Sequence, residues 1–100
     1  MATIDSVDIG TMITRDPNRH HGRPHIAGTG VSVRRIAGWY KLGYSPEEIA
    51  DNYGHLTLAQ VYAALAYYHA NHAEMDAAFA AEEAEEERLE KEFLANQGKA

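Results

Sequence analysis

The sequence predicts a mainly α-helical domain that begins with a short β-hairpin, and three observations support this fold class. Two neighbouring stretches carry the pattern of a helix capping box, in which a hydroxyl residue precedes Glu or Gln by three positions. Apolar residues recur at alternating steps of three and four over the C-terminal half, which is the spacing of a packed helix. Near the N-terminus, two short apolar stretches flank a glycine-containing turn, as in a hairpin.

The hairpin is predicted from its turn. Residues 12–15 are a possible strand, and the proline- and glycine-rich residues 16–24 indicate a loop. Residues 25–27 and 31–33 flank a Gly-Thr-Gly stretch, which predicts a tight or bulged turn between two short strands. Because a two-stranded unit of this size is marginally stable alone, we expect it to pack on helices or on a second copy of itself.

The first helix start follows directly. Ser32 is expected to cap a helix that ends before Gly43. This start places Arg34 and Arg35 in the first helical turn, which is the unfavourable end of the helix dipole for a cation. Their position therefore suggests a role outside helix formation.

The next two helix starts are stronger because each combines a capping box with a hydrophobic staple. Ser45 and Glu48 form the first box, with proline at the first helical position, and this helix is predicted to end before Gly54. Thr57 and Gln60 form the second box.

The third helix has no evident stop. Neither Gly nor Pro occurs from Leu56 to Gln97, and alanine and glutamate dominate the second half of this stretch. We expect one long helix over residues 58–94, with a break or fraying near residues 82–87. Its apolar positions form a heptad seam at Leu58, Val61, Leu65, Tyr68, His72, Met75 and Phe79, which resumes at Leu89 and Phe93.

The net charge of −6 at pH 7 is unevenly distributed. Residues 1–41 have a balance of +3, residues 42–73 of −3 and residues 74–100 of −6. A basic first part and an acidic last part indicate two partners or two functions. A net negative charge therefore does not exclude a nucleic-acid partner for the first part of the chain.

The second and third predicted helices have the layout of a helix-turn-helix, with Gly54 in the turn. In one interpretation the third helix enters a DNA major groove, where Gln60 is the best candidate base reader. In the other, the same three helices form a core without DNA. No Lys or Arg lies between Lys41 and Arg88, so phosphate contacts would come from earlier cations. The full set of candidate DNA-binding residues is Arg15, Arg19, Arg23, Arg34, Arg35, Lys41, Thr57 and Gln60.

Five glutamates within residues 82–87 mark an acidic tail. One interpretation is a solvated helix end. The other is an acidic arm that places Phe79, Leu89 and Phe93 in a groove on a basic partner, because these apolar residues follow helical spacing.

No catalytic or cofactor function is predicted, and we expect no enzyme, no cofactor and no metal. The sequence carries no nucleophile elbow, phosphate loop or metal triad, and the six histidines have no cysteine beside them. The lack of cysteine fits a reducing compartment, and no apolar run approaches a membrane span. We therefore expect a cytoplasmic protein that does not enter a membrane.

The order of several short motifs resembles the domain-of-unknown-function family numbered 433. In the N-terminal half these motifs are ITRDP at 13–17, GRPHI at 22–26 and GT at 28–29. In the C-terminal half they are GYSPEEIA at 43–50 and AALAYY at 63–68. The resemblance covers residues 12–70 and leaves the acidic tail outside.

This resemblance implies a dimerising hairpin ahead of a three-helix, winged-helix-like domain. It also implies the antitoxin half of a toxin–antitoxin pair, whose partner is a PIN-like ribonuclease and whose target is its own operator DNA. We accordingly expect a hairpin at 1–31, a helix-turn-helix domain at 32–73 and an acidic helical tail at 74–100. The alternative function is a homodimeric protein-interaction module that uses the long-helix seam and the acidic tail and binds no DNA.

Overall fold

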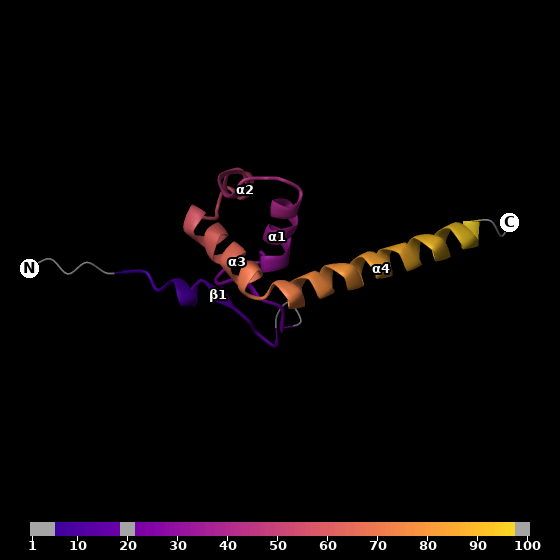
Figure 1. Ribbon diagram of the computed structural model, residues 1–100, viewed down its shortest axis with the longest axis horizontal. Coiled ribbons are helices and arrows are strands. Elements are labelled where there is room, and N and C mark those ends of the chain that lie inside the picture. The colour runs from indigo at the N-terminus through magenta and orange to yellow at the C-terminus, as the bar shows by residue number, and fades with distance from the viewer. Residues whose placement is uncertain (1–5, 19–21, 98–100) are drawn as a thin grey trace, which may run out of the picture. The chain divides into compact units, whose positions relative to one another are not determined.

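The computed structural model describes residues 6–18 and 22–97, and these are mainly helical. The elements are the 3-10 helix η1 (Ile9–Thr11), the strands β1 (Ile13–Thr14) and β2 (His25–Ile26), and the helices α1 (Val33–Lys41), α2 (Pro46–Tyr53), α3 (Leu58–Ala70) and α4 (His72–Gln97) (Figure 1). The predicted fold class, a short N-terminal hairpin ahead of helices, is confirmed. No helix in the described part of the chain has both the length and the apolar character needed to cross a bilayer.

The hairpin pairs differently from the prediction. β1 and β2 are antiparallel, with Ile13 opposite Ile26, so the long loop between them connects the strands. The predicted strand at residues 31–33 is wrong: only one bridge, between His25 and Ser32, joins it to β2. The reason is that Ser32 caps α1, so Val33 is already helical.

The three predicted helix starts are confirmed. Ser32 Oγ accepts the amide of Arg35 at 3.1 Å, which begins α1. At α2, Ser45 Oγ accepts the Glu48 amide at 3.1 Å and Glu48 Oε1 accepts the Ser45 amide at 3.1 Å. A residue with positive φ, Gly54 at 67°, ends α2, a conformation that glycine adopts without strain.

We predicted one long helix over residues 58–94 with a break or fraying near residues 82–87, and the position of that break is wrong. The helix stops at Ala70 and α4 begins at His72, whereas the glutamate-rich residues 82–87 are helical throughout. Asparagine is a preferred residue before a helix start, and the Asn71 carbonyl accepts the Met75 amide at 3.0 Å as α4 begins. The apolar spacing continues across this break, so periodicity alone does not reveal it.

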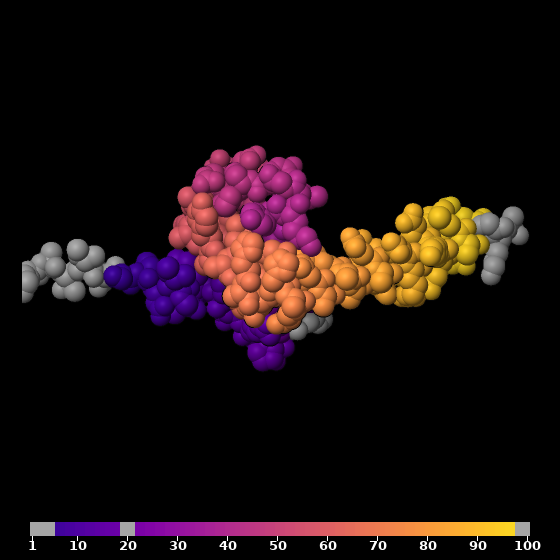
Figure 2. Space-filling view, in the orientation of Figure 1, coloured from indigo at the N-terminus to yellow at the C-terminus, as the bar shows by residue number. Residues whose placement is uncertain are grey.

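The chain divides into two compact units, Met1–Ala70 and Asn71–Ala100. In the first unit, α1, α2 and α3 pack on one another, α1 also packs on β2, and α3 packs on both strands (Figure 1). Its hydrophobic core is contributed by every one of these helices and by β2: Ile26, Val31, Val33, Ile36, Ala37, Ile49, Leu56, Val61, Ala63, Ala64, Leu65 and Tyr68. In the second unit, all side chains from residue 83 to 97 are exposed, and Figure 2 shows the surface of this stretch in orange to yellow.

Candidate nucleic-acid and partner interfaces

Arg23 and the adjacent pair Arg34 and Arg35 come from two stretches of the sequence that meet at the start of α1. The Ser32 cap fixes Arg34 and Arg35 in the first turn of α1. The amide of Val33 donates to the carbonyl oxygen of Pro24 at 3.0 Å, which holds the neighbouring Arg23 against the same turn. We refer to Arg23, Arg34 and Arg35 as the arginine cluster.

Within the arginine cluster, Arg23 and Arg35 lie close enough to Arg34 to affect it electrostatically. The pKa of Arg34 lies below its ordinary value, first because partial burial penalises the charged form and then because Arg23 and Arg35 repel it. The side chains of Arg23 and Arg35 are exposed, whereas Arg34 is half-buried. Positive charge is thus concentrated at one place on the surface of the first unit, where an anion would relieve the repulsion.

His25 supports this cluster from inside. Its side chain is only 5% exposed, and its Nδ1 lies 3.3 Å from the carbonyl oxygen of Arg23. The backbone of His25 also bridges Ser32, the cap of α1. The sequence did not predict this role of His25, because its burial and its contact with Arg23 depend on the fold.

Of the other described cations in the predicted DNA-binding set, Arg15 contacts α3 and Lys41 lies in the last turn of α1. Arg15 donates from Nε to the hydroxyl oxygen of Tyr67 on α3 at 3.1 Å and from Nη2 to the same oxygen, and its guanidinium lies 5.8 Å from the centre of that ring. Lys41 is in the last turn of α1, roughly 10 Å along the helix axis from Arg34 at 1.5 Å per residue. Arg19 is outside the described residues.

The start of α3 is engaged in its own capping box. Gln60 Oε1 accepts the Thr57 amide at 2.7 Å, and Thr57 Oγ1 accepts the Gln60 amide at 3.1 Å. The two side-chain oxygens of the predicted reading surface therefore bond to the α3 backbone. Thr57 and Gln60 therefore contact each other in the capping box at the start of α3. The arginine cluster forms at a different place, the start of α1.

A carboxylate of α2 lies beside the exposed face of α3. Tyr62, which is 49% exposed, donates its hydroxyl to Glu47 Oε1 at 3.3 Å. The negative charge of Glu47 raises the pKa of the Tyr62 hydroxyl, with smaller effects of desolvation and of the hydrogen bond itself. Together with Glu48 and Asp51, Glu47 makes the α2–α3 surface acidic, since no Lys or Arg lies between Lys41 and Arg88.

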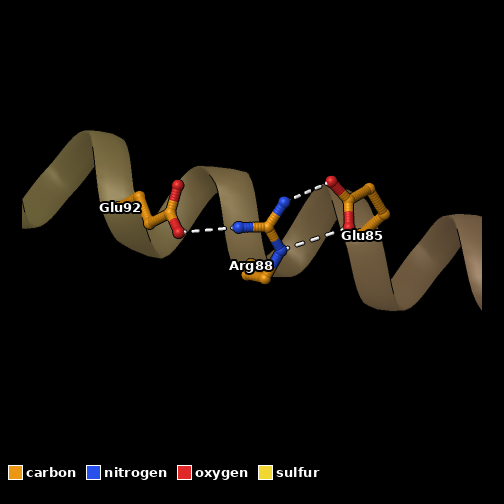
Figure 3. A network of polar contacts seen from close by, with 3 residues as sticks. All are labelled: Glu85, Arg88 and Glu92. Carbon is orange, nitrogen blue, oxygen red and sulfur yellow. Dashed lines mark hydrogen bonds and ion pairs between the residues drawn. The ribbon is translucent and has the colours of Figure 1, made fainter.

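In the second unit, the acidic helix α4 carries an ion-pair network around Arg88 (Figure 3). Arg88 donates from Nε to Glu85 Oε2 at 3.1 Å and from Nη1 to Glu92 Oε1 at 2.7 Å. The hydrogen bond with Arg88 lowers the pKa of the Glu85 carboxyl, and the same contact raises the pKa of Arg88. The network joins successive turns of the helix and offsets one of its few positive charges.

The predicted apolar anchors of the tail differ in exposure. Leu89 is 50% exposed and Phe93 is 61% exposed. The two residues are four positions apart on α4, so they lie about one helical turn from each other on the same face. Phe79 is half-buried. Leu94, which is not one of the predicted anchors, is also exposed on the same turn as Phe93.

The histidines of the described residues make local contacts. His72 Nδ1 lies 2.8 Å from Asp76 Oδ2 on α4, and the rings of Tyr40 and His69 meet edge to face at 5.5 Å. Within the described ranges, no three His, Cys, Asp or Glu side chains form a group that could hold a metal ion. His20 and His21 are outside the described residues.

Comparison with known proteins identifies the family. The chain is similar to a solved structure, the crystal structure of a DUF433 member protein from Anabaena variabilis ATCC 29413, with 27% sequence identity and a TM-score of 0.64. The similarity covers 70% of this chain and 69% of that chain. No curated protein is similar enough to count as a relative. Residues 13–68 match the family described as "Protein of unknown function (DUF433)", and because this match spans more than half of the chain, the protein belongs to the DUF433 family.

Proposed function

We propose that this protein is an antitoxin-like DNA-binding regulator, which binds the DNA upstream of its own gene as a homodimer and pairs with a cognate toxin through α4. The observation that carries the proposal is the arginine cluster at the start of α1. The exposed side chains of Arg23 and Arg35, together with the half-buried Arg34 that both repel, are well suited to the closely spaced phosphates of a DNA backbone.

The dimer follows from the geometry of operator DNA. Dimers of such small domains bind two half-sites about 34 Å apart, one helical turn of DNA, so protein two-fold symmetry matches DNA two-fold symmetry. A dimer also doubles the number of arginines on the DNA. The affinity of a protein for DNA rises with each phosphate it neutralises.

The partner function is assigned to α4. Its exposed Leu89 and Phe93 are apolar anchors on a strongly acidic helix, which fits a groove that is apolar at its floor and basic at its rim. A PIN-like nuclease is the expected partner because the family resemblance implies one. Such a nuclease binds RNA, so a basic surface beside its active site is chemically reasonable.

Two experiments test this function. In the first, the full-length protein is mixed with duplex DNA from upstream of its gene at ~0.1 M salt, and a gel shift is compared with that of unrelated duplex of equal length. We expect a shift with the upstream DNA that survives an excess of unrelated competitor. In the second, the protein is co-expressed with the product of the neighbouring reading frame, and co-purification is expected. Absence of a specific shift contradicts the DNA function, and absence of co-purification contradicts the toxin function.

A second candidate function is a homodimeric interaction module that binds no DNA. The acidic α2–α3 surface favours it, since α2 carries Glu47, Glu48 and Asp51, and Glu47 contacts the helix that a helix-turn-helix protein inserts into DNA. This module would remain dimeric and would show no DNA affinity at any salt concentration. The gel shift therefore separates the two functions.

A further inference from the structure

We infer that DNA docks on the arginine cluster at the junction of β2 and α1, and not on the start of α3, where a helix-turn-helix protein would read the major groove. This inference rests on the proposed function and deepens it by naming the surface.

The start of α3 has the wrong charge for DNA. Glu47 lies against Tyr62 with a contact of 3.3 Å, and the span from residue 42 to residue 73 has three carboxylates and no Lys or Arg. A helix that enters a groove passes between two phosphate backbones, so carboxylates on the neighbouring helix meet phosphates directly. Like charges at such positions repel, and no cation of α3 offsets them.

The start of α3 also has few polar atoms to offer a base. The Thr57 hydroxyl and the Gln60 side-chain oxygen each accept a backbone amide of the same helix. A bidentate contact between glutamine and adenine uses both the oxygen and the nitrogen of the amide. Reading a base in this way would require Gln60 to release the Thr57 amide, which would weaken the helix start.

The arginine cluster has the opposite properties. Arg23 and Arg35 are exposed, and the backbones that carry them are tied together by the bond from the Val33 amide to the Pro24 carbonyl at 3.0 Å. Buried His25 lies 3.3 Å from the Arg23 carbonyl oxygen and supports this arrangement. The backbone that carries these arginines is therefore fixed before DNA arrives, and a guanidinium group can engage a phosphate, or a guanine, through two parallel hydrogen bonds.

The experiment uses fluorescence anisotropy with the full-length protein and an upstream duplex of about 30 base pairs, a length that accommodates two half-sites. One variant, R23Q/R35Q, removes two exposed charges of the cluster. A second variant, A59E, adds a carboxylate to an exposed position in the first turn of α3, where a negative charge is compatible with the helix dipole. The control R88Q/K91Q removes the same amount of charge from α4.

We expect R23Q/R35Q to weaken binding at least tenfold and to reduce the slope of log K against log salt by about 1.8 per protomer, since each lost phosphate contact contributes about 0.9. A59E and R88Q/K91Q should stay within twofold of the unchanged protein. Circular dichroism checks that each variant is folded.

Loss of binding in A59E with binding retained in R23Q/R35Q overturns the inference and assigns DNA to α3. Equal losses in both variants also overturn it, because the cluster would then not be the separate docking surface. If the unchanged protein binds no DNA, the proposed function itself fails, and this result is distinct from either outcome of the variants.

Discussion

The amide of Val33 donates to the carbonyl oxygen of Pro24 at 3.0 Å, and this bond places Arg23 beside the first turn of α1. Ser32, the residue before Val33, caps the same turn and bridges His25. The start of α1 and the end of β2 are therefore one local unit. The arginine cluster depends on these contacts, and so does the proposed DNA binding.

The Ser32 cap links stability to the arginine cluster. Ser32→Ala removes the acceptor of the Arg35 amide, and we expect a loss of about 1 kcal/mol in the free energy of unfolding, as for other N-cap serines. Fraying of the first turn should also weaken DNA binding. Chemical denaturation and anisotropy measure the two effects, with Ser6→Ala at an exposed position as control. Unchanged stability in Ser32→Ala would show that the cap is not needed.

The two capping boxes should contribute separately. Ser45→Ala and Thr57→Ala each remove a hydroxyl that accepts a backbone amide at 3.1 Å, and each should cost about 1 kcal/mol. The boxes share no partner, so the double variant should lose the sum of the two single effects within about 0.5 kcal/mol. Chemical denaturation measures these losses, as shifts of the midpoint with no change in the dependence of the unfolding free energy on denaturant concentration. A double variant no less stable than either single one would mean that α2 and α3 do not form their starts independently.

These helix starts were predictable because a capping box is local: the residues that bond lie three positions apart. The break at Asn71 was not, since the apolar spacing runs across it and no Gly or Pro marks it. The proximity of Arg23 to Arg34 could not be predicted from the sequence either, because it depends on a hydrogen bond between the loop before β2 and the first residue of α1. The charge pattern indicated which part of the chain is basic, and the fold decided which arginines lie together.

The Glu85 carboxyl provides a pH test of α4. Its pKa is lowered from the ordinary value of 4.5, primarily by the hydrogen bond with Arg88. A depressed folded pKa means that this pair stabilises the helix above the unfolded pKa and that the contribution disappears as the pH falls through the folded pKa. An NMR titration of Glu85 should therefore give a value below 4.5 that rises toward normal in Arg88→Gln. An identical titration in both proteins would contradict the paired geometry.

The exposed anchors of α4 should matter for a partner and hardly for folding. Leu89→Ala/Phe93→Ala removes side chains that are 50% and 61% exposed, so stability should change by less than about 0.5 kcal/mol per site. Co-purification with the neighbouring gene product should be lost. Leu42→Ala, which removes an apolar side chain exposed to 73% in the first unit, is the matched control and should retain the partner. Retention of the partner by the α4 variant would place the partner surface elsewhere.

We propose above that two copies of this chain bind the DNA upstream of its own gene. Sedimentation velocity of that duplex, labelled and mixed with full-length protein at ~0.1 M salt, tests it most directly. We expect a complex that is heavier than the free duplex by two protomers of 11.1 kDa. This complex should form with the upstream sequence and not with a scrambled duplex. A duplex that sediments unchanged at micromolar protein would contradict it.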